Sequence, residues 1–264
     1  DIYTHIAGID LIRNESGDFY VLEDNLRTPS GVSYMLENRE ITRRLYPKFI
    51  PKNKVLPINN YPTLLYNQLK SLSGKKKPVI VLLTPGLYNS AYYEHTALAR
   101  LMGVELVEGN DLVTENNCVF MKTAGGLKIV DIIYRRVDDD FLDPLNFNSA
   151  SVLGVAGIMD SYRNGNVIIV NAPGSGIADD KAVYTYVPDM ISYYLNEKPI
   201  LENIKTFKLS NEDEKEYVKK NIEKLVIKRT DGSGGYGMLI GKDASEKEIE
   251  KFIKKIKKEP EMYI

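Results

Sequence analysis

The chain has 264 residues, the size of one large domain or two small ones. Apolar residues make up 43% of it and charged residues 27%, and these globular proportions exclude a disordered or fibrous chain. The 35 basic and 36 acidic residues give a net charge of −1, which excludes a nucleic-acid-binding protein that relies on overall positive charge.

The cysteine content and the apolar runs set further limits. The single cysteine, Cys118, excludes an internal disulfide framework and a cysteine-based zinc site. No apolar run reaches the roughly 18 residues that a membrane-spanning helix needs. We therefore expect neither nucleic acid nor membrane among the partners, and a cytoplasmic setting is the default expectation.

The first quarter of the chain predicts a β-hairpin followed by two helices. Residues 5–27 contain two strand-like runs, and Asn14–Gly17 between them has the residue types that turns favour. Apolar and charged side chains follow a helical spacing over residues 32–46. A second helix is expected over Thr63–Leu72, and the change of composition at Ser73–Lys77 indicates a domain junction.

The middle of the chain predicts a parallel sheet. Val79–Leu83 is a continuous apolar run, as expected of a strand that is buried on both faces. Residues 91–102 predict a helix and residues 104–107 a second strand, and this β-α-β order is typical of parallel strands joined by a crossover helix. Residues 119–121 and 129–134 then predict strands on either side of a hairpin-like pair of glycines.

The last third of the chain predicts a buried strand, a hairpin and a capped helix. The strand is Val167–Val170, and Leu225–Arg229 and Met238–Ile240 predict the arms of the hairpin. A capping box that begins at Ser245 predicts an amphipathic helix. Residues 260–264 are typical of a strand that begins there, so we expect the chain to be a piece of a longer protein.

The hairpin at the start of the chain carries a candidate metal site. Glu23 and Asn25 are two residues apart and point to the same face of a strand, and Asp10 lies on the partner strand. Two carboxylates and an amide oxygen are ligands that Mg²⁺ prefers, and Arg27 on the same face could bind a phosphate or a carboxylate. The alternative is a solvated hairpin with ordinary surface charge, and the spacing alone favours that alternative.

A glycine-rich segment follows the strand that contains Lys228. Glycines allow the backbone to approach a ligand closely and to cradle phosphate, and the Lys228 ammonium could reach a phosphate as a point charge. A Walker A loop and a Rossmann fingerprint are excluded, because a strand follows the loop where each needs a helix. A plain turn needs fewer glycines, so we favour a functional loop. Its candidate ligand-binding residues are Lys228, Gly232, Ser233, Gly234, Gly235 and Gly237.

Two further clusters leave both a functional and a structural interpretation open. Lys181 ends a loop between a predicted strand and a predicted helix, where α/β folds bind ligands, and a cation at a helix start needs an anionic partner. A surface lysine explains it equally well. Arg135 and Arg136 end a strand and could bind a carboxylate or phosphate, or they could pair with the aspartates at 138–140.

The loop after residue 83 has an open interpretation of its own. It is rich in polar aromatic residues and could bind substrate. In the structural alternative, Glu94 is an acidic residue in the first turn of its own helix, which the helix dipole favours. His95 is then a histidine satisfied within the fold, and Cys118 is a structural thiol.

Three motifs together resemble the circularly permuted ATP-grasp family, whose best-known members are the glutathionylspermidine synthetases. They are Leu22–Gly31, the loop that ends at Lys181, and Val226–Met238. The metal motif precedes the glycine-rich loop here, which is the order that the permutation implies. The resemblance implies an ATP-dependent carboxylate–amine ligase, in which a carboxylate attacks the γ-phosphate and an amine then displaces phosphate from the acyl phosphate.

The resemblance also implies roles for individual residues. It assigns Asp10, Glu23 and Asn25 to magnesium, with two ions expected, and it assigns Lys181 and Lys228 to the phosphates and the adenine side of ATP. The implied cofactors are therefore ATP and Mg²⁺.

The loop Gly232–Gly237 would cover the phosphates, and Arg27 and Arg135 are the candidates that hold acyl phosphate or substrate. Gly8 stands where the synthetases have a substrate-contacting arginine, and their amidase domain is absent. Glutathione and spermidine are therefore not the expected substrates.

We therefore expect an α/β fold, a circularly permuted ATP-grasp with an inserted Rossmann-like parallel-sheet region. Residues 1–74 would form the ATP-grasp part with the metal motif, residues 75–165 the substrate region, and residues 166–264 an incomplete nucleotide-binding part. The expected partners are a small-molecule or peptide carboxylate and an amine, with a partner protein possible, and the isolated fragment is expected to be inactive. A non-catalytic nucleotide-binding or scaffold protein that works with a partner enzyme is the alternative, and a kinase-like phosphotransferase is a third interpretation.

Overall fold

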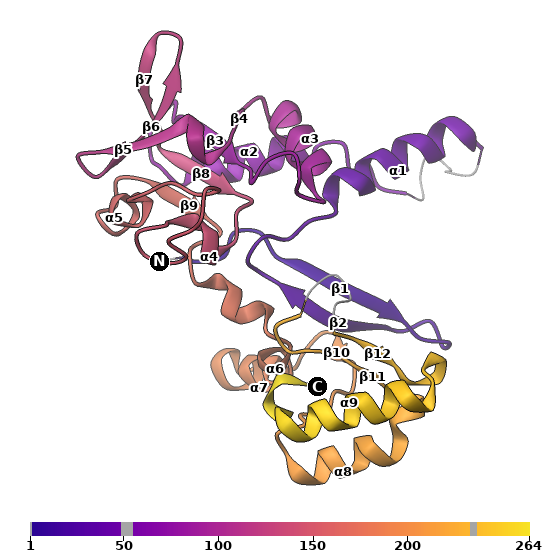
Figure 1. Ribbon diagram of the computed structural model, residues 1–264. Helices are drawn as coiled ribbons and strands as arrows, with labels where there is room; N and C mark the ends of the chain where they lie inside the picture. The colour runs from indigo at the N-terminus through magenta and orange to yellow at the C-terminus, as the bar shows by residue number, and fades with distance from the viewer. Residues whose placement is uncertain (1, 49–54, 233–236) are drawn as a thin grey trace. The chain divides into compact units, whose positions relative to one another are not determined.

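The computed structural model describes residues 2–48, 55–232 and 237–264, and its contacts divide the chain into two compact units (Figure 1). The first unit contains Asp1–Ala7 and Leu26–Ser175, and the second contains Gly8–Asn25 and Gly176–Ile264. The chain therefore crosses between the units three times. The roles expected from the sequence for residues 1–74, 75–165 and 166–264 stay predictions.

The core of the first unit is a four-stranded parallel sheet in the order β4-β3-β8-β9. Its strands are β3 (Ile80–Leu83), β4 (Glu105–Val107), β8 (Ile132–Arg135) and β9 (Ile168–Val170). Helix α3 (Tyr92–Met102) connects β3 to β4. The predicted parallel sheet with a crossover helix is confirmed.

Successive residues of β3 point to opposite faces of the sheet, and both faces are buried. On one face, α2 (Tyr61–Ser71) and α3 contribute Leu69 and Leu98, which join the apolar cluster that contains Leu82 and Ile132. This two-sided burial explains why the strand is apolar throughout. The unit also contains α1 (Val32–Leu45), α4 (Asp139–Leu142), α5 (Ile158–Arg163) and a 3₁₀ turn at Gly109–Asp111.

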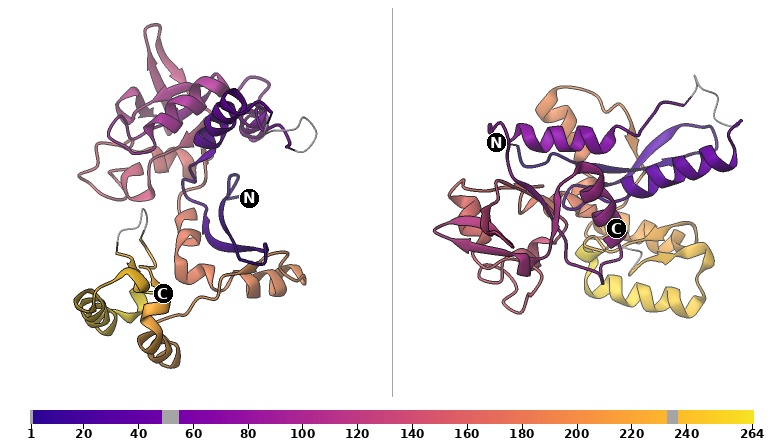
Figure 2. Two further views of the ribbon diagram at one scale, coloured as in Figure 1. Left: turned by 90° about the vertical axis from the view of Figure 1, so that its right-hand side faces the viewer. Right: turned by 90° about the horizontal axis from the view of Figure 1, so that it is seen from above.

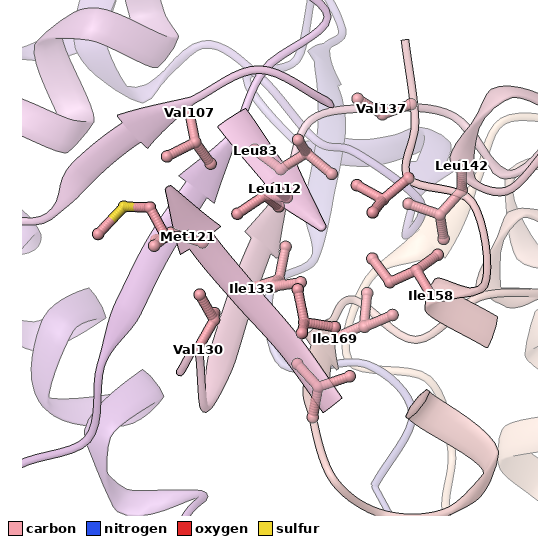
Figure 3. Packing of buried hydrophobic residues seen from close by; sticks show 14 of the residues in the cluster. Leu83, Val107, Leu112, Met121, Val130, Ile133, Val137, Leu142, Ile158 and Ile169 are labelled. Atoms are coloured by element: carbon pink, nitrogen blue, oxygen red, sulfur yellow. The ribbon is translucent and has the colours of Figure 1, made fainter. Parts of the chain in front are cut away.

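A second, antiparallel sheet contributes to the cluster on the other face. It runs in the order β5-β6-β7, with β5 (Leu112–Glu115), β6 (Cys118–Thr123) and β7 (Gly126–Ile129). Leu112 and Met121 lie opposite each other in its register and belong to the same buried cluster as Leu83 and Ile133 of the parallel sheet (Figure 3). The β6–β7 hairpin projects from the rest of the unit, and every residue of β7 is exposed (Figures 1 and 2).

One predicted strand is two strands in the structure. The run 129–134 was expected to form a single arm of the glycine hairpin, but β7 ends at Ile129 and β8 begins at Ile132 in the other sheet. Between them, the Asp131 carboxylate accepts the backbone N–H of Val79 at 2.8 Å. This contact ties the chain to the parallel sheet, and Asp131 is the one charged residue that interrupts the otherwise apolar run.

The second unit begins with the predicted hairpin of β1 (Gly8–Arg13) and β2 (Phe19–Asn25), which is confirmed. A short strand, β10 (Glu202–Asn203), pairs with β2 in parallel and gives the order β1-β2-β10. At the hairpin turn, Asn14 Oδ1 accepts the backbone N–H of Asp18 at 2.8 Å. A bulge between Asp10 and Leu11 shifts the register beside the candidate metal site.

The rest of this unit packs around a small apolar core. The predicted hairpin of β11 (Val226–Ile227) and β12 (Leu239–Ile240) is confirmed, and so is the capping box of Ser245 at the start of α9 (Glu246–Lys258). Residues of these elements and of α8 (Glu212–Asn221) form the core, which contains Ile227, Leu239, Ile256 and Val218. The unit also contains α6 (Lys181–Tyr184), α7 (Val187–Met190) and a π-helical turn at Ile191–Leu195.

The last residues of the chain pair with the strand before the glycine-rich loop. Lys228 and Ile264 exchange two backbone hydrogen bonds of 3.0 Å, and Arg229 pairs with Tyr263 in an antiparallel bridge. Among the described residues, none of the helices combines the length and the apolar character that a bilayer-spanning segment requires.

Gly241 is expected to tolerate no side chain, because a Cβ atom built there would lie 1.8 Å from the backbone oxygen of Ile222. The Gly241→Ala substitution should lower the free energy of unfolding by about 1–3 kcal/mol, as overpacking does. Urea unfolding monitored by circular dichroism measures the change.

Gly125→Ala is the control for this substitution, because a Cβ there would meet only the Thr123 hydroxyl at 3.8 Å. It should change stability by less than about 0.5 kcal/mol. Equal stabilities of the two variants would contradict the packing described around Gly241.

Candidate functional site

The three predicted metal ligands lie together on the β1–β2 hairpin. Asp10 is directly opposite Glu23 in the register, and Asn25 is two residues further along the same strand face. Burial raises the pKa of the Asp10 carboxyl and the adjacent Glu23 charge raises it further, whereas Lys228 and a hydrogen bond from Asn25 lower it. The two carboxylates are thus close enough to repel each other, and a shared cation would relieve that repulsion.

The two predicted phosphate-binding lysines share the same carboxylate. Lys181 Nζ lies 3.3 Å and Lys228 Nζ 3.6 Å from Glu23 Oε2. All three side chains are at least three-quarters buried, with exposed fractions of 13%, 25% and 22% for Lys181, Lys228 and Glu23. Among the described residues, Glu23 Oε2 is buried and makes no hydrogen bond of good geometry, and the two ammonium groups are the cations near its charge.

Local structure explains how Lys181 reaches this position. Asp180 caps the first turn of α6 by accepting the backbone N–H groups of Ala182 and Val183 at 2.7 and 3.3 Å. The Lys181 backbone N–H donates to Thr230 O at 3.0 Å, which fixes the start of α6 to the segment after β11. The anionic partner that a lysine at a helix start needs is the Glu23 carboxylate.

Lys181 also contacts the base of the glycine-rich loop. Its Nζ donates to the backbone oxygen of Gly232 at 2.8 Å. At the far end of the loop, Gly237 has a φ of +71°, and a Cβ there would lie 2.7 Å from Arg229 Cδ. Three predicted ligand-binding residues of the loop, Ser233, Gly234 and Gly235, lie outside the described residues.

A cavity of about 310 Å³ adjoins the charged cluster within the second unit. Glu23, Lys181 and Lys228 line it together with mostly apolar side chains and with Lys205, Thr206 and Lys224. Tyr184 belongs to its wall and donates its hydroxyl to Val21 O at 2.6 Å, and burial raises the pKa of this phenol to about 12. The other apolar side chains that line it are Ile12, Leu22, Ile204, Phe207, Val218, Leu225, Val226, Ile227 and Ile264.

These residues fit a magnesium ion that is coordinated partly by the protein and partly by phosphate oxygens. In the described part of the chain, no group of three or more His, Cys, Asp and Glu side chains could hold a metal on its own. Two carboxylates and the Asn25 amide leave coordination positions for phosphate oxygens, which is how Mg²⁺ commonly binds. Such an ion would give the buried Glu23 Oε2 the partner that it lacks among the described residues.

The two candidate arginines belong to the first unit, whereas the candidate metal ligands belong to the second. Arg27 Nε is 3.7 Å from Asp138 Oδ1, and the fully buried Arg135 has its Nη2 2.9 Å from Asp139 Oδ1. Burial lowers the pKa of the Arg135 guanidinium, and the charge of Asp139 opposes that effect. The structure thus contains the arginine–aspartate pairing that was one of the two interpretations, and contact of Arg27 or Arg135 with substrate stays a prediction.

Glu94 has a role that its sequence position did not indicate. Its carboxylate accepts the backbone N–H groups of Gly31 and Ser33 at 2.9 Å, so it caps the start of α1 and not only its own helix. Arg136 Nη2 lies 3.7 Å from this carboxylate. Gly31 at the N-cap carries no side chain that could cap the helix, and this is the one sequence signal of an external cap.

His95 is held inside the first unit as a neutral ring. Its Nδ1 lies 2.8 Å from Thr84 Oγ1. Burial and, to a smaller extent, the charge of Arg136 lower its pKa to about 4. These contacts agree with a histidine that is satisfied within the fold.

Comparison with known proteins first defines the fold. The chain matches a glutathione synthetase-like effector from Globodera pallida, in its apo form, with a TM-score of 0.62. The match covers 97% of this chain and 58% of the effector at 14% sequence identity. The chain therefore has the mixed α/β fold of glutathione synthetase-like proteins.

The family model described as circularly permuted ATP-grasp type 2 matches residues 1–264, and the chain belongs to this family. The expected family and fold class are confirmed.

Similar proteins occur in several bacteria. An uncharacterised protein of Mycobacterium tuberculosis is 51% identical over 98% of this chain and 48% of its own length. An uncharacterised protein of Synechocystis is 48% identical over 100% of this chain and 55% of its own. A Frankia alni protein, named as a candidate glutamate–cysteine ligase, is 38% identical over 98% of this chain and 30% of its own. The chain thus spans about half the length of the Mycobacterium tuberculosis and Synechocystis relatives.

Acid is expected to destabilise the protein through His95. The unfolded chain protonates this ring near pH 6.5 and the folded chain only near pH 4, so stability falls as the pH decreases between these values. Between pH 7 and pH 4, wild type should lose about 3 kcal/mol more than a His95→Gln variant. Urea unfolding at the two pH values measures this difference, and equal losses would contradict a neutral buried His95.

Proposed function

We propose that the protein to which this chain belongs is an ATP-dependent ligase that joins a carboxylate to an amine through an acyl phosphate. The observation that carries the proposal is the cluster of Asp10, Glu23, Lys181 and Lys228 at the charged end of an apolar cavity. Membership in the ATP-grasp family and the ligase name of the Frankia relative support it. The proposal keeps the cytoplasmic setting expected from the sequence.

The cofactors in this proposal are ATP and Mg²⁺, which supply the phosphoryl group and neutralise its charge when bound. Asp10, Glu23 and Asn25 would hold the metal, and Lys181 and Lys228 would bind phosphate oxygens. Phosphoryl transfer needs positioning and electrostatic stabilisation more than side-chain acids and bases, and this residue set provides both. The apolar cavity has walls that suit the flat, weakly polar adenine ring.

Glu23 links the metal to the phosphates in this proposal. Its Oε2 is now held by two ammonium groups and by no hydrogen bond. A cation bound to Glu23 would take over this charge and leave Lys181 and Lys228 to bind phosphate. Metal and nucleotide should therefore bind more tightly together than either does alone.

The substrates in this proposal are a small-molecule or peptide carboxylate and an amine. Arg27 is the candidate that holds the carboxylate or its acyl phosphate, because its side chain is one-third exposed and near Asp138. Arg135 is a weaker candidate, since its guanidinium is fully buried and donates to three backbone oxygens. Because the relatives are about twice as long, we expect residues 1–264 alone to be inactive.

Removal of the Glu23 carboxylate is expected to abolish activity in the full-length protein. Glu23→Ala should reduce Mg·ATP-dependent phosphate release by at least about 100-fold, as loss of a key electrostatic group does. Circular dichroism should show an unchanged fold. Unchanged activity would contradict the metal assignment.

Asp24→Asn is the matched control for Glu23→Ala, because Asp24 is the next residue and points to the opposite face of β2. It should retain activity within about twofold. Phosphate release that requires an added amine supports a ligase. Formation of ADP and a phosphorylated acceptor, without phosphate release, supports a kinase. Neither reaction in the full-length protein supports the scaffold alternative.

Lys228→Met should weaken the binding of Mg·ATP by about 10-fold or more, because a charge-assisted contact to phosphate is lost. Titration calorimetry on the full-length protein measures the dissociation constant. Lys242→Met removes an exposed lysine of the same unit and should leave the constant unchanged. Equal affinities of the two variants would argue against a phosphate contact of Lys228.

A further inference from the structure

The two ends of the β1–β2 hairpin and the chain that follows β9 meet at one side chain of the first unit. The chain crosses between the units after residues 7, 25 and 175. The three connecting segments of the first unit next to these crossings are residues 3–7, Leu26 and residues 171–175. Asn171 comes directly after β9 and is 98% buried, with an exposed fraction of 2%. No function assigned above uses this residue.

The Asn171 side-chain amide binds both ends of the hairpin. Its Oδ1 accepts the backbone N–H groups of His5 and Ile6 at 2.9 and 3.0 Å. Its Nδ2 donates to the backbone oxygens of Ile6 and Leu26 at 2.7 and 2.6 Å. An amide has two N–H donors and two acceptor lone pairs, so all its bonding capacity is used on these two segments.

The third connecting segment is fixed by Arg135. The fully buried guanidinium donates from Nε to Asn171 O at 2.8 Å and from Nη2 to Ala172 O at 3.2 Å. The Ala172 backbone N–H donates in turn to Tyr3 O at 2.9 Å. The backbone at Asn171 and Ala172 is thus held by the Arg135 guanidinium, which needs these hydrogen bonds because an unbonded buried charge is costly.

These contacts matter because of what lies between the two tethered ends. Ile6 is four residues before Asp10, and Leu26 directly follows Asn25. The amide therefore sets the spacing of the two strands at the end of the hairpin that is nearest to the candidate metal ligands in sequence. A one-residue slip in register would turn Glu23 to the other face of the hairpin. The amide opposes such a slip from the end opposite the turn, because it binds the backbone of Ile6 and of Leu26.

We propose that Asn171 is a positioning residue for the metal site. It acts through the two segments that its amide binds, which directly precede and follow the β1–β2 hairpin. This role rests on the proposed function, since it concerns the placement of Asp10, Glu23 and Asn25. A side chain that bound only one end could not fix the spacing between them.

The first test is hydrogen exchange by NMR at the His5 and Ile6 amides, because both donate to Asn171 Oδ1. In Asn171→Leu these amides should exchange about 10- to 100-fold faster than in wild type. In Asn171→Asp the carboxylate still accepts from them, so their exchange should stay near the wild-type rate while the donors to Ile6 and Leu26 are lost. Unchanged exchange in the leucine variant would overturn the proposal.

The second test is the magnesium dependence of ATP binding by the full-length protein. In both Asn171 variants, the Mg²⁺ concentration for half-maximal binding should rise about 10-fold, whereas ATP affinity in the presence of EDTA should change less than twofold. Asn166→Leu is the control: Asn166 donates to Asn117 O, in the first unit and outside the connecting segments, and should leave both values unchanged. A merely structural role would lower the midpoint of thermal unfolding without this selective shift, and that result would overturn the proposal.

The two tests separate this inference from the proposed function. Faster exchange in the leucine variant shows that the amide holds the hairpin ends whether or not a nucleotide binds. If wild type binds no Mg·ATP, the proposed function fails and the positioning role fails with it. If wild type binds Mg·ATP and the variants keep its magnesium dependence, only the positioning role is overturned.

Discussion

Two buried guanidinium groups at the end of β8 are the constraint on which the first unit depends. A buried charge is costly unless it is bonded, and Arg135 bonds through all three of its nitrogens while Arg136 bonds through its two terminal nitrogens. Arg136 donates to Thr28 O, Pro29 O and Ser30 Oγ, while Arg135 binds the segment after β9. The carboxyl end of a parallel sheet is where α/β folds usually bind ligands. Here the two arginines at the end of β8 bind other segments of the chain itself.

The second unit shows the opposite arrangement, because its central charge is incompletely bonded. Glu23 Oε2 is buried between two lysines and lacks a hydrogen bond, whereas the arginines of the first unit donate to several oxygens each. Arg136 Nε is the exception, buried without a hydrogen-bond partner. This difference separates a cluster that holds the fold together from the one to which we assign metal and phosphate in the proposed function.

Local patterns predicted most elements, but contacts between distant segments could not be predicted. The turn at Asn14–Gly17, the capping box at Ser245 and the hairpin around the glycine-rich loop are each specified within a few residues, and the structure contains all three. The alternation of Glu23 and Asn25 likewise predicted their common face. Glu94 capping a helix 61 residues away, and the Asn171 amide binding Ile6 and Leu26, depend on tertiary packing that no local pattern records.

The interleaved order of the two units has a consequence for synthesis of the chain. The β1–β2 hairpin is synthesised well before its partner strand β10, which begins at Glu202, and before the Asn171 amide. At 5–20 residues per second, the hairpin waits roughly 10–30 s for that strand. The edge of β2 that pairs with β10 has no partner strand meanwhile, and the high sequence separation of these contacts favours slow folding.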